Sequence, residues 1–406
     1  MISNGRLALL AERNFRVFYV GYAISLLGSA MSTIALTFAV LGDGGSAGDL
    51  GYVFAAAVVP EAIFMLGGGV LADRIGRRAV MLGTDTIRLV VQVTLATALF
   101  AGHPPIWLIA VLAGLLGTGS AFFTPALGGL TPQIAAGKLA DANALLGVAG
   151  SAATIAGPAL AGILIAVTSP ATVIAVDAAS FAASVVALAL LRVPAVRPAA
   201  RSPWRDLAEG WAQFRAHTWL WVTTVQFALF NLFTWAPYLL LGPILARDYL
   251  GGARAWGLIV AANAAGAIAM GAIVLGRRPR RPMTVAVLAG FGYPAPCLAL
   301  ALQAPGYAVA ACAAVAGAAS TISGTYYSTV LQQQVAPDML GRVTAFSLTG
   351  SYTFGAAGYA IIGPIAGVVG ATRLLAFAAG YATLSSAMLM TVPAIHRVRW
   401  RESPAQ

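Results

Sequence analysis

Twelve long runs of mostly apolar residues, joined for the most part by short turns, make up most of this chain. Every run exceeds the length of about 20 residues that a helix needs to cross the hydrocarbon core of a bilayer. The runs are continuously apolar and do not alternate, which excludes membrane-spanning β-strands. The sequence therefore predicts an all-α polytopic membrane protein, with transmembrane helices at residues 16–41, 50–72, 79–100, 106–127, 142–167, 170–191, 218–243, 255–276, 283–303, 306–330, 341–368 and 371–394.

The composition agrees with a lipid environment. Of the 406 residues, 59% are hydrophobic and 9% are charged, whereas soluble domains carry about 25% charged residues. The net charge of +11 comes mainly from arginines in short turns, without the basic face and base-reading groups that nucleic-acid binding needs. We therefore expect no nucleic-acid partner and a bilayer around the helices. Cys297 and Cys312 fall inside apolar runs and are expected to be free thiols.

The basic residues also predict an orientation. With the N-terminus inside, three arginines fall on outside loops, Arg88 lies within a run, and the other 20 of the 24 Lys and Arg residues lie on cytoplasmic segments. Cytoplasmic loops carry an excess of such residues. We therefore expect both termini to be cytoplasmic, in the inner or plasma membrane of a bacterium. The polar start of the chain predicts no cleavable signal peptide.

The second half of the chain repeats features of the first at an offset of about 204 residues. This repeat predicts two pseudo-symmetric six-helix halves, residues 1–191 and 218–406, around a central cavity. The matched pairs are Phe122-Phe123 with Tyr326-Tyr327, Pro132 with Pro337, Gly157-Pro158 with Gly363-Pro364, and Arg77-Arg78 with Arg280-Arg281.

Residues 192–217 form a long polar stretch between the halves, which we interpret as a cytoplasmic linker. Ser202 is suited to cap a helix that has Pro203 at its first position. Such a helix favours binding at the inner membrane surface, and the alternative is a linker whose aromatic residues pack on the helix ends. Its apolar face would hold Trp204, Leu207, Trp211 and Phe214.

The turn between the second and third runs carries the most specific motif. Residues 69–78 resemble, at ten positions in order, the signature G-x-L-a-D-r-x-G-r-k/r between helices 2 and 3 of major facilitator superfamily transporters. The likeness extends over about residues 12–395. Four shorter and less specific motifs resemble those of the branch that holds enterobactin exporters and macrolide efflux proteins. They are Asn14-Phe15-Arg16, the stretch Phe122–Ala126, the stretch Leu139–Asn143, and Gly341-Arg342-Val343.

The resemblance implies that this turn is a conformational latch. Asp73 would accept hydrogen bonds from the N-terminus of helix 11, near Gly341, where backbone N–H groups are unsatisfied. Breaking and remaking that contact would bias the inward-open and outward-open states, so we expect Asp73→Asn to abolish transport without removing the protein from the membrane. The latch residues are Gly69, Asp73, Arg74, Gly76, Arg77 and Arg78.

The fifth run carries a second motif, Gly157-Pro158 followed by Gly162. It resembles the G-P-x-x-G-G element of antiporters in the superfamily, with Ala161 in place of one glycine. Glycine allows a neighbouring helix to approach closely and proline permits a bend. The resemblance therefore implies export, and the alternative is tight helix packing alone.

Four charged residues lie well inside the runs, away from their ends, and are candidates for proton coupling: Glu61, Asp85, Arg88 and Asp177. A charge at the bilayer centre costs about 2.5–3.5 kcal/mol, so such residues are functional candidates. Glu61 lies deepest and is the first candidate, unless it is a buried acid that bonds to a neighbouring helix. Asp85 and Arg88 are three residues apart and can pair, which favours a structural role. Asp177 is either a proton or cation site or a polar group at the outer mouth.

The superfamily resemblance implies that helices 1, 4, 7 and 10 line the cavity. Small hydroxyl groups and large aromatic rings there suit a bulky, mostly apolar ligand, although Ser and Thr also join membrane helices. Many proton-driven exporters carry an arginine in helix 4, which this chain lacks, so proton coupling does not transfer directly. The cavity candidates are Ser29, Phe122, Phe123, Gln226, Asn231, Trp235 and Tyr326.

These features together predict a secondary active exporter of amphipathic small molecules of the antibiotic or siderophore type, driven by proton antiport. The alternatives are a facilitator or symporter and a lysolipid flippase on the same fold. The G-x-S-x-G match at Gly44–Gly48 lies in a loop rather than a strand–turn–helix elbow, so we expect no enzyme. The three histidines lack metal-site spacing, and we expect neither metal nor cofactor. Two halves in one chain can form a complete pathway, so no oligomer is required.

Overall fold

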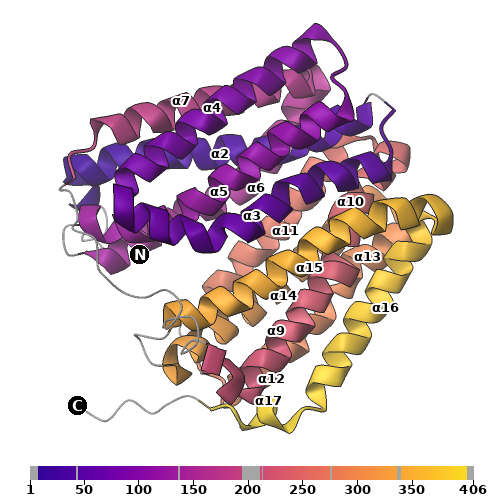
Figure 1. Ribbon diagram of the computed structural model, residues 1–406. Helices are drawn as coiled ribbons and strands as arrows, with labels where there is room; N and C mark the ends of the chain where they lie inside the picture. Colours follow the sequence, from indigo (N-terminus) through magenta and orange to yellow (C-terminus); the bar gives the residue numbers. More distant parts are fainter. Residues whose placement is uncertain are drawn as a thin grey trace, which may run out of the picture. The chain divides into compact units, whose positions relative to one another are not determined.

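The computed structural model describes residues 8–42, 44–135, 138–193, 211–212, 214–274, 277–335 and 340–399. Within these ranges every regular element is a helix (Figure 1). Eleven of the described helical segments are long and apolar enough to cross a membrane. The remaining run, the eleventh along the chain, forms α15 (Leu340–Val369), in which the described apolar stretch is Ala357–Val369. The predicted all-α fold with twelve transmembrane helices is confirmed.

The first six spans are single helices, and several extend beyond the predicted apolar runs. The fourth span, for example, has 29 residues, which at 1.5 Å per residue exceeds the hydrocarbon core of about 30 Å. The helix therefore continues into the interfacial region. After the 3-10 turn η1 (Ala8–Ala11), the helices are α2 (Arg13–Gly42), α3 (Ala47–Ile75), α4 (Arg77–Ala101), α5 (Ile106–Ile134), α6 (Leu139–Val167) and α7 (Pro170–Leu190).

Two of the later spans are interrupted. The seventh comprises α9 (Thr218–Phe230), the π-helical segment η2 (Asn231–Trp235), α10 (Ala236–Leu245) and a second π-helical segment, η3 (Ala246–Leu250). The ninth comprises α12 (Pro282–Ala289), the 3-10 turn η4 (Gly290–Gly292) and α13 (Pro294–Ala301). Proline lacks a backbone donor and disrupts the hydrogen-bond ladder, and prolines lie at the start of α10 and α13. The remaining helices are α11 (Ala253–Val274), α14 (Gly306–Gln334), α16 (Ala371–Met390) and α17 (Pro393–Arg397).

The contacts between residues divide the chain into two compact units. The first comprises Met1–Ala200 with Gly251–Ala261, and the second comprises Arg201–Leu250 with Ala262–Gln406. The amphipathic helix predicted in the linker lies mostly outside the described residues. Of its apolar face, Trp211 and Phe214 stack with ring centroids 5.6 Å apart, and Phe214 is buried.

Each unit has its own arrangement of packed helices. In the first, α2 packs against α6 and α7, α3 against α5, and α4 against α5 and α7. In the second, α15 packs against α9 and α10, α12 against α14, and α13 against α14 and α16. Glycines bring the backbones together at matching places: a Cβ on Gly117 would lie 1.8 Å from the carbonyl oxygen of Ala57, and one on Gly317 would lie 1.8 Å from that of Asn263.

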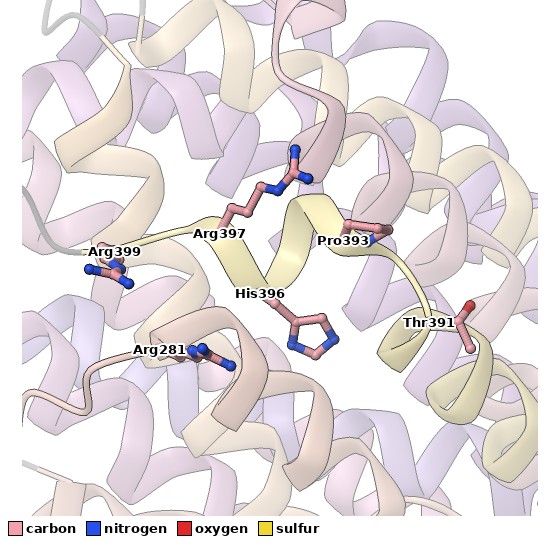
Figure 2. Close-up of a pocket in the computed structure, with 6 residues that line it drawn as sticks. All are labelled: Arg281, Thr391, Pro393, His396, Arg397 and Arg399. Atoms are coloured by element: carbon pink, nitrogen blue, oxygen red, sulfur yellow. The ribbon is translucent and has the colours of Figure 1, made fainter.

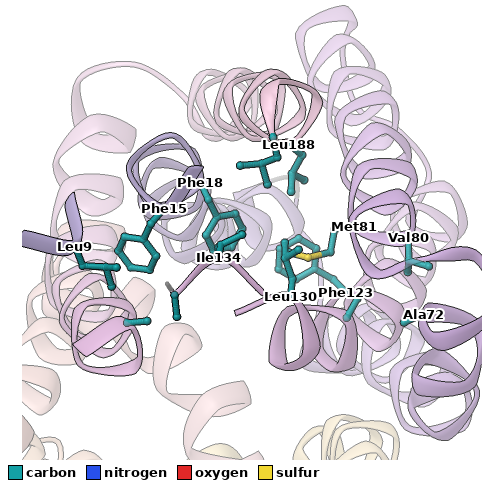
Figure 3. Close-up of a cluster of buried hydrophobic side chains, with 14 residues drawn as sticks. Leu9, Phe15, Phe18, Ala72, Val80, Met81, Phe123, Leu130, Ile134 and Leu188 are labelled. Atoms are coloured by element: carbon teal, nitrogen blue, oxygen red, sulfur yellow. The ribbon is translucent and has the colours of Figure 1, made fainter. Parts of the chain in front are cut away.

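A hydrophobic cluster closes one end of the first unit (Figure 3). Phe15 and Phe18 from α2 meet Met81 from α4, Leu130 from α5 and Leu188 from α7. Because all five side chains are almost completely excluded from solvent, their burial holds the ends of these helices together. The buried side chains of Asp85, Arg88, Gln92 and Asp177 lie farther along α4 and α7.

Candidate functional site: a buried ion network in the first unit

Arg88 is the centre of a polar network inside the first unit. Its Nη1 atom lies 3.2 Å from Oδ1 of Asp85, one turn earlier on α4. Its Nη2 atom donates to Oγ of Ser120 on α5 at 2.9 Å. The guanidinium also lies 4.8 Å from the ring centroid of Phe123 and 5.7 Å from that of Phe181. A carboxylate, a hydroxyl and two aromatic faces therefore replace water around this buried cation.

Asp85 extends the network to α7. It is fully buried, and its second oxygen, Oδ2, accepts a hydrogen bond from Oγ of Ser184 at 2.6 Å. The ion pair that the spacing of Asp85 and Arg88 allows is therefore present and lies among α4, α5 and α7. Removing one member of such a pair leaves an uncompensated charge in a low-dielectric interior.

Asp177 on α7 is the centre of a second part of the network. It is 1% exposed, and its carboxylate accepts hydrogen bonds from Nε2 of Gln92 and, at 3.0 Å, from Oγ of Ser180. Nε2 of Gln92 also donates to Oγ of Ser32 on α2 at 2.7 Å. Asp177 is therefore enclosed among α2, α4 and α7 and is not exposed at the end of its helix. A Cβ on Gly28 would lie 2.6 Å from Oδ1 of Asp177, so this glycine lets α2 approach the carboxylate.

The carboxylates interact with one cation. Arg88 has electrostatic interactions with Asp85, Glu61 and Asp177, which come from α4, α3 and α7. Glu61 is half-buried, in contrast to the other two. If all three carboxylates were ionised, one guanidinium would face three negative charges, so binding or release of a proton would change the charge balance of the whole network.

Gln92, Ser180 and Ser184 were not identified from the sequence. A signal was available, because positions 85, 88 and 92 share one face of a helix. A glutamine one turn beyond a charged pair in an apolar run would have indicated an extended polar stripe. Oε1 of Gln92 is buried without a hydrogen-bond partner among the described residues. Gln92 therefore joins three helices while one of its own polar atoms stays unsatisfied.

The charged turn holds the ends of neighbouring helices. Gly76 ends α3 with φ at 96°, a conformation that favours glycine, and α4 begins at the next residue. Arg77 donates to the carbonyl oxygen of Gly129 on α5 at 2.6 Å. Arg78 donates to the carbonyl oxygens of Leu188 and Ala189 in the last turn of α7, each at 2.7 Å. Cations there bond to carbonyl groups at the helix C-terminus and complement the helix dipole.

The rest of the predicted latch is only partly described. Arg74 is exposed. The side chain of Asp73, Gly69 and the region around Gly341 lie outside the residues whose surroundings the structure describes. The predicted contact between Asp73 and the start of helix 11 therefore stays a prediction.

The glycine and proline motif of the fifth run lies at close helix contacts. A Cβ on Gly157 would lie 2.5 Å from Cβ of Ala30 on α2. A Cβ on Gly162 would lie 2.8 Å from the carbonyl oxygen of Ala253, at the start of α11. A Cβ on Gly257 would lie 2.4 Å from the carbonyl oxygen of Pro158. The motif thus provides the close packing that its composition predicts, and its implied link to antiport stays a prediction.

The cavity candidates of the first unit have different environments. Phe123 lies under the guanidinium of Arg88 and stacks with Tyr22 at 6.3 Å, so it is part of the ion network. Phe122 stacks with Phe64 of α3 at 6.1 Å, and Ser29 is half-buried. Of the three, Phe123 is thus the one most enclosed within the unit.

The candidates of the second unit lie mainly along the interrupted seventh span. Asn231 and Trp235 are the first and last residues of the π-helical segment η2, and such segments are frequent at functional sites. Gln226 donates to Oγ of Ser385 on α16 at 3.3 Å. Tyr326 on α14 is buried against Val274 and Ala286, so it lies inside the unit.

The described residues contain no group of three or more His, Cys, Asp or Glu side chains that could hold a metal ion. Cys297 is buried and Cys312 is half-buried, and both are free thiols. The ion network of the first unit contains carboxylates, hydroxyls, an amide and a guanidinium, which can bind protons and cations or reorganise hydrogen bonds.

Comparison with known proteins decides the family. The family model described as Major Facilitator Superfamily matches residues 18–359, most of the chain. This chain belongs to the major facilitator superfamily. It is a multi-pass membrane transporter of a small-molecule substrate and not an enzyme, as the sequence predicted.

Two similar superfamily proteins are efflux proteins by name. The chain is 27% identical over 351 residues to Macrolide efflux protein A of Streptococcus pyogenes, covering 83% of this chain and 85% of that protein. It is also 27% identical over 357 residues to Multidrug efflux pump Tap of Mycobacterium bovis, covering 84% of each. The predicted likeness to the macrolide efflux branch is therefore confirmed.

Solved structures support the superfamily fold. A crystal structure of a mutant of the nucleoside transporter NupG superposes with a TM-score of 0.73 and covers 94% of this chain and 99% of that one. The two sequences are 13% identical, so this likeness concerns the fold alone.

Proposed function

We propose that this transporter is a secondary active exporter of amphipathic small molecules of the antibiotic or siderophore type, and that it exchanges substrate for protons by alternating access. The observation that carries the direction and the substrate class is its likeness to a macrolide efflux protein and a multidrug efflux pump over most of their lengths. We carry over the broad class that the two names share, rather than one compound.

The buried network supports proton coupling. Helix α5 has no arginine of its own, yet Arg88 extends from α4 to Ser120 and Phe123 on α5. A guanidinium therefore lies against α5 although it comes from another helix. In this proposal, Arg88 takes the place of the helix-4 arginine found in many proton-driven exporters.

In this proposal the three carboxylates around Arg88 have different roles. Asp85 holds the guanidinium through a direct ion pair and has a positioning role. Glu61 is half-buried and interacts electrostatically with Arg88, and as the least buried of the three it is the first candidate to carry the proton. Asp177 is enclosed by Gln92 and Ser180 and is the second candidate. Protonation of either one would weaken its attraction to Arg88 and shift the balance between conformations.

The latch and the fifth-helix motif complete the proposal. Asp73 and its basic neighbours would stabilise one state at the cytoplasmic ends of the helices, and both termini would lie in the cytoplasm. Gly157, Pro158 and Gly162 would allow the close contacts of α6 to be remade during the transport cycle. The two halves, residues 1–191 and 218–406, would move as the two units of alternating access without a partner chain.

The test is proton movement in inside-out membrane vesicles that contain the protein and have been energised to an acidic interior. Addition of a macrolide, a cationic dye or a siderophore is expected to release protons from wild-type vesicles. Glu61→Gln is expected to abolish this release while the substrate still binds. Glu12→Gln removes the same charge from an exposed position outside the spans and serves as the matched control.

Three other results of this experiment would point to a different mechanism or a different coupling residue. Substrate movement down its own gradient without proton release would identify a facilitator and contradict antiport. Movement of labelled lysolipid, with no movement of the soluble compounds, would identify a flippase. Proton release that survives Glu61→Gln but is lost in Asp177→Asn would move the coupling group to α7.

A further inference from the structure

A basic pocket lies in the second compact unit, where α12 begins and α16 gives way to α17 (Figure 2). Its volume is about 480 Å³. Figure 2 shows Arg281 at the start of α12 on one side of the short helix α17, which carries His396 and Arg397. The lining residues are Arg281, Thr391, Pro393, His396, Arg397 and Arg399.

Hydrogen bonds hold the wall of the pocket in place. Nε2 of His396 lies 2.7 Å from the carbonyl oxygen of Met390, and because a carbonyl only accepts, this nitrogen carries the proton. Nδ1 lies 3.0 Å from Oγ1 of Thr284 on α12. The backbone oxygen of Arg399 accepts from Nε2 of Gln334 on α14 at 3.2 Å. The segment after α16 is thus attached to both α12 and α14.

The positive charge of the pocket has no described counter-ion. Arg281, Arg397 and Arg399 all have exposed side chains. In the described part of this unit the acidic residue is Asp248, which pairs with Arg247 at 3.0 Å. Arg281 is also the N-cap of α12, whose first turn has no side-chain cap, so the positive end of a helix dipole adds to the three arginines. An anion from outside the described residues would compensate this charge.

The position of the pocket points to a lipid anion. The pocket is lined by Arg281, just before α12, and by the segment that follows α16. The pattern of basic residues assigns both segments to the cytoplasmic side. On α16, one turn before Thr391, Met388 is 61% exposed, and one further turn away Leu384 is 60% exposed. On α12, Leu288 is 51% exposed. An apolar helix surface therefore extends into the predicted membrane from the same two helices that border the arginines.

We propose that this pocket binds the phosphate group of an anionic phospholipid of the cytoplasmic leaflet, with the acyl chains along α16. An arginine guanidinium can donate two parallel hydrogen bonds to two oxygens of one phosphate group. Basic pockets between transmembrane helices on the cytoplasmic side bind anionic headgroups. A free phosphate has the same headgroup chemistry but lacks the acyl chains. The site is separate from the ion network and does not depend on the proposed transport reaction.

The test measures lipid binding directly, by native mass spectrometry of the purified full-length protein with added phosphatidylglycerol or phosphatidylcholine. The triple variant Arg281→Gln, Arg397→Gln and Arg399→Gln is expected to bind phosphatidylglycerol on the order of 100-fold more weakly than wild type. The matched control, Arg277→Gln with Arg278→Gln and Arg280→Gln, removes the same charge from the same surface region but from residues that do not line the pocket. It is expected to keep most of the binding.

Further variants and competing ligands test the proposal in the same binding experiment. Replacing the three pocket arginines by lysine should restore much of the binding and show that the glutamine variant had not simply misfolded. Equal losses in the pocket and control variants would mean diffuse surface charge and overturn the site. Equal binding of phosphatidylcholine would overturn the anionic headgroup. Glycerol phosphate that displaces phosphatidylglycerol at equal concentration would overturn the role of the acyl chains and identify a soluble phosphate site.

Discussion

The two halves of this transporter share their helix packing but differ in the polar groups that they bury. Gly117 against Ala57 in the first half is matched by Gly317 against Asn263 in the second. Yet the first half buries Asp85, Arg88 and Asp177, whereas the buried polar residues described in the second half are threonines and serines. At the repeat offset of about 204 residues, Gly292 and Pro296 stand where the first half has Arg88 and Gln92.

This difference separates what the fold requires from what is added to it. A six-helix half of this kind packs without any buried charge, as the described part of the second half shows. Each charge within the membrane costs about 2.5–3.5 kcal/mol, so the ion network of the first half is not needed for packing. The second half instead has interrupted helices, η2, η3 and η4, where backbone conformations can change more easily. We infer that the first half supplies ionisable groups and the second supplies conformational freedom.

The strongest test of this comparison removes the buried cation. Arg88→Gln should lower the free energy of unfolding by about 3–5 kcal/mol, because Asp85 would remain buried without a counter-charge. The measurement is thermal and chemical unfolding of the purified protein, together with substrate efflux, which should be lost. The double variant Asp85→Asn with Arg88→Gln should recover part of the stability.

A matched change in the second half gives the control for this test. Arg247 pairs with Asp248 at 3.0 Å, with side chains 39% and 50% exposed, and an exposed pair contributes about 0–1 kcal/mol. Arg247→Gln should therefore have little effect on unfolding. If the two arginine variants were equally destabilised, the contrast between the halves would fail.

A smaller effect is expected from the two glutamines. Gln92→Leu removes the donor that joins Ser32 and Asp177 and leaves their buried oxygens without this partner, so it should lower the free energy of unfolding by about 2–3 kcal/mol. Gln226→Leu removes one longer bond, of 3.3 Å, from a half-buried side chain, and should cost less than about 1 kcal/mol. The measurement is the unfolding midpoint in the same detergent. A larger loss in Gln226→Leu would reverse the assignment of the important polar contacts to the first half.

The last comparison tests what the halves share. Gly117→Ala and Gly317→Ala should each lower the free energy of unfolding by about 2–3 kcal/mol, because the overlapped atoms belong to the backbone of the facing helix. The added methyl group overpacks a helix contact, while alanine recovers part of the cost through its helix propensity. Among the described residues, no atom beyond the glycine's own stretch of helix lies within 4 Å of a Cβ at Gly128 on α5 or at Gly324 on α14, so alanine there should be neutral or stabilising. Unequal effects of Gly117→Ala and Gly317→Ala would show that the repeat in sequence does not extend to helix packing.

Much of the fold could be predicted because the membrane imposes strict requirements. Every backbone N–H and C=O group inside the bilayer needs an internal partner, so a long apolar run has to form a helix. The twelve helices were therefore predicted from hydropathy. The superfamily was predicted from the motif in the charged turn. The interruptions in the seventh and ninth spans were not predicted, since prolines occur both in bent and in regular membrane helices. For example, α5 contains Pro125 and Pro132 and stays continuous.

The sequence by itself determined which residues are exceptional: Glu61, Asp85, Arg88 and Asp177 are costly wherever they lie within an apolar helix. Only the tertiary structure decided their partners on other helices. Asp85 and Arg88 lie on one helix, so their spacing allowed the pairing. The contacts to Ser120, Phe123, Ser184 and Gln92 join helices that are far apart in the chain. Helical periodicity specifies which residues share a face, whereas helix packing specifies what that face meets.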